Sequence, residues 1–132
     1  MKYIFLICPL VSLAVCQLLK IFVAILKKKE ITLSLITSSG GMPSAHSCFV
    51  SSLVTIIGLV EGVDSSFFAI SLVFGLITCY DASHIRRESG MHAKLLNEKF
   101  NMKLNINLGH ELKEVIAGII TGMLVTLIIY FL

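Results

Sequence analysis

Two short segments of the chain place a histidine at the start of an apolar stretch. Residues 40–47 read GGMPSAHS, and residues 107–118 read NLGHELKEVIAG. In the second segment Glu114 follows His110 by four residues, and residues four apart share one face of a helix. A carboxylate behind an imidazole fixes its tautomer and supports the cation that forms when the other nitrogen attacks or takes a proton. The spacing therefore predicts nucleophilic or acid–base chemistry at His110.

The first segment predicts the start of a helix that can receive an anion. Gly40 and Gly41 allow backbone geometries closed to other residues, and Pro43 suits a first helical turn. Ser44, His46 and the N–H groups of that turn would face the membrane interface. Phosphate is the anion most often bound at such a helix terminus.

A third polar segment, CYDASHIRRESG at residues 79–90, ends another apolar stretch. Asp81 is costly at the end of a membrane span unless it is paired, and Arg86 or Arg87 is the expected partner. Two adjacent guanidiniums suit a bidentate grip on phosphate oxygens. The three segments together predict a site for phosphate binding and phosphoryl transfer.

Each of these residues also has a plainer interpretation. A histidine at a membrane interface is often only an amphipathic anchor, and Arg86 and Arg87 can be charges that set the topology. His84 and His92 are assigned to this plainer class. A divalent-metal site on Asp81 and His84 has too few ligands in the sequence, so no metal and no cofactor are expected.

The composition places these segments in a membrane. Of the 132 residues 56% are hydrophobic and only 14% are charged, against roughly a quarter in soluble domains. We expect an all-α integral membrane protein, a single domain over residues 1–132, with a short interfacial helix where Met91, Leu95 and Phe100 recur. Windows long enough to cross a bilayer predict four transmembrane helices. They are Tyr3–Leu26, Ala45–Val60, Phe67–Ala82 and Val115–Leu132.

The distribution of cations predicts the orientation. Nine of the eleven basic residues lie after the first span or between the third and fourth, while the loop from Glu61 to Ser66 carries acids and no cation. By the positive-inside rule both termini lie outside, and all three polar segments lie at the cytoplasmic face of a bacterial-type cell membrane. We expect the bilayer, and no nucleic acid, as the partner.

The polar segments resemble the motifs of a known superfamily. PSAHS at 43–47 is similar to the P-S-G-H motif of the type 2 phosphatidic acid phosphatases, and HELKEVIAG at 110–118 to their H-x-x-x-D-V-x-A-G motif. The order of the three segments, from Gly40 to Gly122, is closer still to a small divergent branch related to acid phosphatases and vanadium-dependent haloperoxidases.

The resemblance implies a role for each residue. His110 would attack phosphorus to form a phosphohistidine, Glu114 would orient it, and His46 would protonate the leaving oxygen. Ser44 and nearby N–H groups would hold phosphate oxygens, and this covalent route needs no metal.

The sequence departs from the superfamily at several motif positions. Ala45 replaces a glycine and Glu114 an aspartate. The first motif, K-x6-R-P, is absent, and the expected S-R before the nucleophile falls on Lys103 and Leu104. Our hypothesis is that Arg86 and Arg87, with Asp81, supply the missing phosphate contacts.

Two functions remain open from the sequence. The first is a membrane lipid-phosphate phosphatase, acting on a phosphomonoester or diphosphate at the cytoplasmic face; a homodimer is compatible with so small a bundle. The alternative is a non-catalytic membrane module that binds anionic lipid headgroups or a partner protein.

Overall fold

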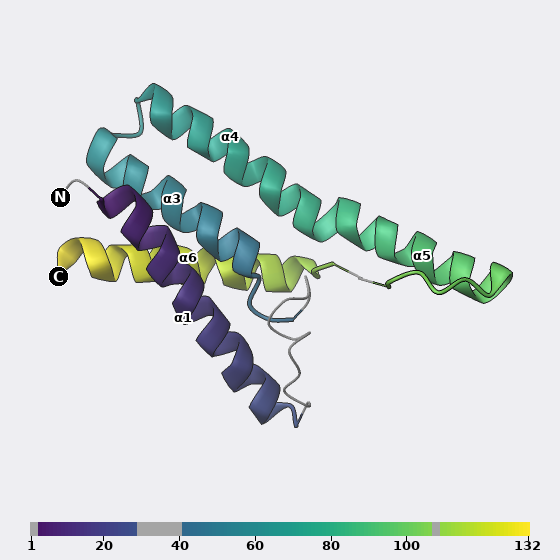
Figure 1. The fold of residues 1–132 in the computed structure, drawn as a ribbon. Coiled ribbons are helices and arrows are strands. Elements are labelled where there is room, and N and C mark those ends of the chain that lie inside the picture. Colours follow the sequence, from purple (N-terminus) through teal and green to yellow (C-terminus); the bar gives the residue numbers. More distant parts are fainter. Residues whose placement is uncertain (1–2, 29–40, 107–108) are drawn as a thin grey trace.

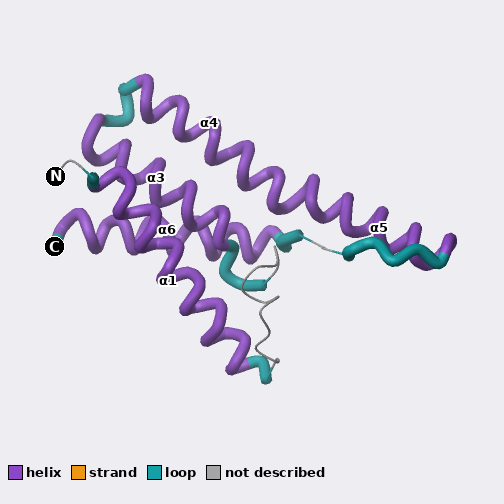
Figure 2. Tube along the Cα trace, in the orientation of Figure 1, coloured by secondary structure: helices purple, strands orange, loops and turns teal. Residues whose placement is uncertain are grey.

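Every regular element in the described part of the chain is a helix. The computed structural model describes residues 3–28, 41–106 and 109–132 (Figure 1; Figure 2). The predicted all-α fold is confirmed. The elements are α1 (Ile4–Leu26), α3 (Ala45–Glu61), α4 (Ser66–Tyr80), the π-helical turn η1 (Asp81–Ile85), α5 (Arg86–Phe100) and α6 (Leu112–Phe131).

The helices have the length and apolarity of a membrane bundle. Three helical stretches are long and apolar enough to cross a bilayer: Ile4–Leu26, Ser66–Phe100 and Leu112–Phe131. The helix at the second predicted span, α3, is apolar but has only 17 residues. Large apolar side chains such as Leu18 and Phe22 cover the outside of the bundle, as a hydrocarbon solvent requires.

The predicted spans agree with the observed helices to within three residues at each end. One detail of the prediction is wrong, since Pro43 precedes α3 and takes no part in its first turn. The Ser44 hydroxyl accepts a hydrogen bond from the Ser47 N–H, so Ser44 is the N-cap and the helix begins at Ala45.

Helices α3 and α6 form the closest contact in the bundle and begin at the same end of it (Figure 1). A methyl group on Gly118 would overlap the Ser44 carbonyl, and one on Gly122 would overlap the Cys48 carbonyl and the Ser51 hydroxyl. Small residues at a spacing of four let helix backbones approach closely in membranes. This contact holds the N-termini of α3 and α6 side by side.

Hydroxyl groups reinforce the contact where α1 joins it. Ser12 donates to the Ser52 hydroxyl at 3.0 Å, and the Ser52 and Thr126 hydroxyls lie 2.6 Å apart. Thr126 also donates to the Gly122 carbonyl at 2.8 Å. Because lipid offers these groups no water, their mutual hydrogen bonds link α1, α3 and α6 in the middle of the bundle.

The segment predicted to form a separate interfacial helix is helical, as α5, but it is not a separate element because it continues directly from α4 through η1. The 20 residues of α4 and η1 extend roughly 30 Å, which already matches a hydrocarbon core. The charged α5 therefore projects beyond the bundle (Figure 1). Asn97 bonds both the N–H and the carbonyl of Leu104, which turns the chain back along α5 towards α6.

Candidate functional site

Four elements bring polar residues to one end of the bundle (Figure 1). They are the second half of α1, the first turns of α3 and α6, and the junction between η1 and α5. The Ser44 N–H donates to the Glu114 carbonyl at 3.0 Å, which joins the start of α3 to the start of α6. The partial positive charges of two helix N-termini therefore act on the same space.

His110 lies at the centre of this end, with 1% of its surface exposed. Its main-chain N–H donates to the Ala82 carbonyl at 3.0 Å, and its ring Nδ1 lies 3.1 Å from Glu114 Oε2. An ionised carboxylate can only accept hydrogen bonds, so Nδ1 carries the proton. The lone pair of the neutral ring is then on Nε2, the nitrogen left for nucleophilic attack.

The surroundings of His110 hold this geometry from both sides. Glu114 Oε2 also accepts a hydrogen bond from the Glu111 N–H at 3.2 Å, which ties the carboxylate to the start of α6. Gly109 has φ of +62°, and a Cβ there would lie 2.9 Å from the Arg87 main-chain nitrogen. Only glycine allows the chain to pass so close to the η1–α5 junction.

The electrostatics of the site favour a neutral imidazole. Burial lowers the pKa of His110 below its ordinary value, because the charged ring would lose its hydration. The hydrogen bond and charge of Glu114 oppose this shift, and the positive charges of Lys20 and Arg86 reinforce it. The net lowered pKa keeps the His110 ring in its nucleophilic form at neutral pH.

The second predicted histidine, His46, lies in the first turn of α3 with its side chain exposed. Its ring is within electrostatic range of His110, Arg86 and Asp81, which come from two other segments of the chain. The fold thus brings together the two histidines that the sequence separates by more than sixty residues.

The predicted pairing of Asp81 is confirmed with Arg86. Arg86 Nε donates to Asp81 Oδ2 at 2.6 Å, with both side chains about one-third exposed. The wider turn of η1 spaces the two residues so that the Arg86 main-chain N–H bonds the Asp81 carbonyl as well. The Arg86 charge acts on both His46 and His110.

The remaining predicted phosphate-binding residues, Arg87 and Ser44, differ in their burial. Arg87 is exposed, and its charge acts on Glu111 at the outer edge of the site. Ser44 is fully buried, and its hydroxyl accepts hydrogen bonds from the main chain and the hydroxyl of Ser47. Gly40 lies outside the described residues. Gly41 has a φ of +89°, a positive value that only glycine adopts readily.

Sequence reasoning missed Lys20, which α1 brings into the site. Lys20 is 3% exposed, and a Cβ on Gly41 would lie 3.0 Å from its Cε. Its ammonium is within electrostatic range of Glu114, His110 and His46. The sequence did contain a signal for it, because Lys20 is the single charged residue within the apolar span Ile4–Leu26. Charged residues inside membrane spans are energetically costly and mark functional sites.

Comparison with known proteins assigns the chain to a family. The Divergent PAP2 family matches residues 1–125. The chain belongs to that family. It is also 39% identical, over 93 residues, to a protein of Bacillus subtilis (strain 168) described as the uncharacterized membrane protein YuiD.

The match to that relative is partial on both sides. It covers 70% of this chain and 59% of the relative, so the chain spans about three-fifths of the length of the curated protein it matches. No solved structure matches the chain. The resemblance expected from the three motifs is confirmed at the level of the Divergent PAP2 family, and the apolar helices and the membrane relative agree on an integral membrane protein.

Proposed function

We propose that this member of the Divergent PAP2 family is a lipid-phosphate phosphatase that works through a phosphohistidine on His110. The observation that carries the proposal is the buried His110 ring, with Nδ1 held by Glu114 and Nε2 left for attack, in range of a second histidine and two cations. A structural histidine needs no such combination.

The reaction takes place in two steps. His110 Nε2 forms a bond to phosphorus while the bond from phosphorus to the ester oxygen breaks, and protonated His46 gives its proton to that leaving oxygen. A water molecule then attacks the phosphohistidine, His46 takes the proton from this water, and the bond from nitrogen to phosphorus breaks. Inorganic phosphate leaves and both histidines return to their starting states.

The phosphate oxygens need positive groups, and the proposal assigns them to Lys20, Arg86 and the first N–H groups of α3. Asp81 orients the Arg86 guanidinium, and Ser44 orders the helix start through its hydrogen bonds with Ser47. Our sequence-based hypothesis assigned this role to Arg86 and Arg87. The proposal keeps Arg86 and puts Lys20 in place of Arg87, because Arg87 lies at the exposed edge. This set also supplies what the absent K-x6-R-P motif would provide.

The cations of the chain also support the sidedness of the site. Lys27 and Lys28, after α1, and the basic residues of α5 lie at the same end of the bundle as His110. By the positive-inside rule this end faces the cytoplasm, so the substrate belongs to the inner leaflet. A homodimer is compatible with the assignment, which needs no residue from a second copy.

The test is phosphate release by the purified protein in detergent, with EDTA present, from a panel of lipid monophosphates and diphosphates. His110→Ala is expected to lower kcat/KM on the order of 10³-fold or more, because the nucleophile is lost. His92→Ala, a histidine of α5 outside the site, serves as the matched control and is expected to retain wild-type activity.

A second readout identifies the covalent step. With lipid carrying ³²P in its phosphate, the wild-type protein is expected to trap an acid-labile, base-stable phosphoenzyme that His110→Ala lacks. Phosphate release that persists in His110→Ala would overturn the mechanism. If folded wild-type protein releases no phosphate from any lipid, the rival assignment as a headgroup-binding module replaces the phosphatase.

A further inference from the structure

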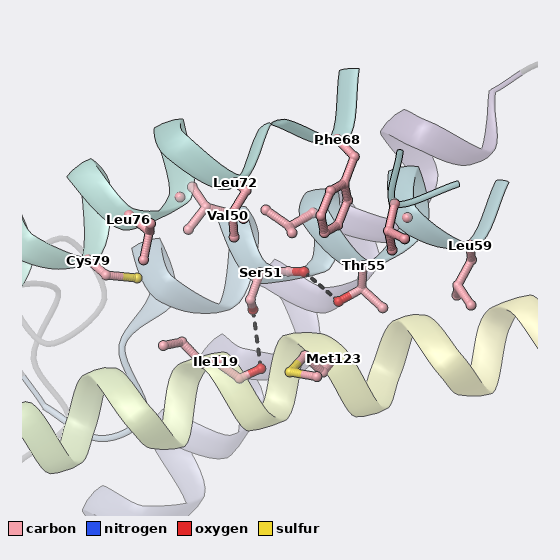
Figure 3. A pocket seen from close by; sticks show the side chains of 14 residues that line it. Val50, Ser51, Thr55, Leu59, Phe68, Leu72, Leu76, Cys79, Ile119 and Met123 are labelled. Carbon is pink, nitrogen blue, oxygen red and sulfur yellow. Dashed lines mark hydrogen bonds between the residues drawn. The ribbon is translucent and has the colours of Figure 1, made fainter. Parts of the chain in front are cut away.

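Helix α4 leaves two cavities along its contact with α3. It packs mainly against α3, whereas α1 and α6 pack against both α3 and each other. On one side a cavity of about 480 Å³ lies between α3, α4 and α6 (Figure 3). On the other side a cavity of about 410 Å³ lies between α1, α3 and α4. Both volumes are within the range of about 300–1,000 Å³ common for small-molecule sites.

The cavity between α1, α3 and α4 is polar at one end and apolar at the other. On each of the three helices the lining includes one polar and one apolar residue, about one turn apart. The polar residue is the one nearer to the candidate site. These pairs are Gln17 and Leu13 on α1, His46 and Phe49 on α3, and Thr78 and Phe74 on α4. The lining thus changes from polar to apolar along the direction that leads from the site into the membrane.

His46 belongs both to this cavity and to the candidate site. In the proposed reaction His46 protonates the leaving oxygen, and that oxygen carries the organic part of the substrate. The organic part must therefore extend away from phosphorus on the side of His46, which is where the cavity begins.

We propose that this cavity, the tail cavity, holds the first part of the hydrocarbon chain of a lipid phosphate whose headgroup is bound between His46 and His110. This inference rests on the proposed function and narrows its substrate to amphiphiles with a flexible apolar chain. The substrate enters sideways from the inner leaflet through the space between α1 and α4. Its chain packs against Leu13, Phe49 and Phe74, which replace the lipid neighbours it leaves.

The larger cavity, on the α6 side, has no comparable link to the site. No proposed catalytic or phosphate-binding residue lines it. Ser51 donates to the Ile119 carbonyl, and Thr55 donates to the Ser51 carbonyl (Figure 3). Ser51 also donates to the Cys48 carbonyl. Ordinary membrane lipid can fill this cavity without preference for a headgroup, which makes it an internal control.

The two cavities can be compared with one fluorophore, because the chain contains no tryptophan. Phe74→Trp reports on the tail cavity and Leu72→Trp on the larger one. The two positions are about 3 Å apart in depth and roughly 200° apart around α4. Both variants are made in a His110→Ala background, so that the probe lipid is not consumed, and are reconstituted in phosphatidylcholine nanodiscs.

The probes are phosphatidic acid and phosphatidylcholine, each brominated on the upper part of its acyl chains and added at the same mole fraction. Quenching of Phe74→Trp by brominated phosphatidic acid is expected to exceed that by brominated phosphatidylcholine at least about twofold, since the headgroup site selects the lipid. Leu72→Trp is expected to be quenched equally by both. Leu13→Trp repeats the measurement from α1, in case Phe74→Trp does not fold.

The outcomes separate this inference from the proposed function. Equal quenching of Phe74→Trp and Leu13→Trp by the two brominated lipids overturns the tail cavity, even if wild-type protein releases phosphate. Selective quenching at these positions supports the tail cavity, and if wild-type protein then releases no phosphate, only the phosphatase assignment fails.

Discussion

The two sides of α3 differ in how closely their partner helices approach. Towards α6 the backbones are nearly in contact, because Gly118 and Gly122 face the Ser44 and Cys48 carbonyls. Towards α4 the contact is made by side-chain atoms, such as those that Phe68 brings to Gly58, and cavities remain beside it. The close side fixes the site, and the open side leaves room for a ligand.

The difference has a physical origin in the membrane. Lipid tails are as apolar as leucine, so helices associate through close packing and hydrogen bonds rather than through the hydrophobic effect. The α3–α6 contact has both, with hydroxyl groups such as Ser52 and Thr126 bonded across it. The α3–α4 contact is made mostly by apolar side chains, with a hydrogen bond between Cys79 and Ser47 as its polar part. Lipid can compete with such apolar contacts.

The largest effect is expected from two cations, one buried in the closely packed region and one at its exposed edge. Lys20→Gln, on the close side, is expected to lower kcat/KM on the order of 10²-fold or more, as loss of one preorganised donor to a transferring group typically does. Arg87→Gln, on the exposed edge, is expected to change it less than about threefold, as a screened surface charge does. The measurement is steady-state phosphate release, with circular dichroism as the folding control. A loss in Lys20→Gln as small as that in Arg87→Gln would place Lys20 outside the site.

A smaller effect is expected from one added methyl group on either side. Gly122→Ala places a Cβ against the Cys48 carbonyl and the Ser51 hydroxyl, and is expected to cost about 1–3 kcal/mol of unfolding free energy. Gly75→Ala places its Cβ 3.3 Å from a methyl group of Val54, which can move, and is expected to be neutral or stabilising by up to about 1 kcal/mol. Denaturant unfolding in mixed micelles measures both. Equal destabilisation would show that the two contacts are equally tight.

The smallest effect is expected in the titration of His110. With its pKa lowered by burial, His110 is expected to titrate below its ordinary value of about 6.5, and Glu114→Gln is expected to lower the pKa further by removing the carboxylate. Nuclear magnetic resonance of ¹³C-labelled histidine measures this, with the signal assigned by its loss in His110→Asn. A pKa at or above 6.5 would show that burial does not outweigh the interaction of the ring with Glu114.

The same shift predicts how stability depends on pH. Between the folded pKa and about 6.5, the unfolded chain binds a proton at His110 that the folded chain does not. The contribution of His110 to folding stability is therefore complete above pH 6.5 and is lost as the pH falls from there through the folded pKa. Glu114→Gln widens this range, because it lowers only the folded value.

Much of the helical architecture could be predicted from the sequence, because the length of an apolar run directly reflects the thickness of a bilayer. The pairing of Asp81 with an arginine could also be predicted, since an acid near a span must find a cation. The exact partner and the continuous α4–η1–α5 stretch could not, because the π-helical turn packs against Gly109 and His110, which are distant in the sequence.

The sequence by itself determined the chemistry that each local segment can perform. His110 and Glu114 are one helical turn apart, so their contact follows from helix geometry alone. Only the tertiary structure decided which distant groups join them, because Lys20 and His46 enter through close packing of α1, α3 and α6. That packing depends on glycines and hydroxyls facing each other across helices, a relation that no local pattern contains.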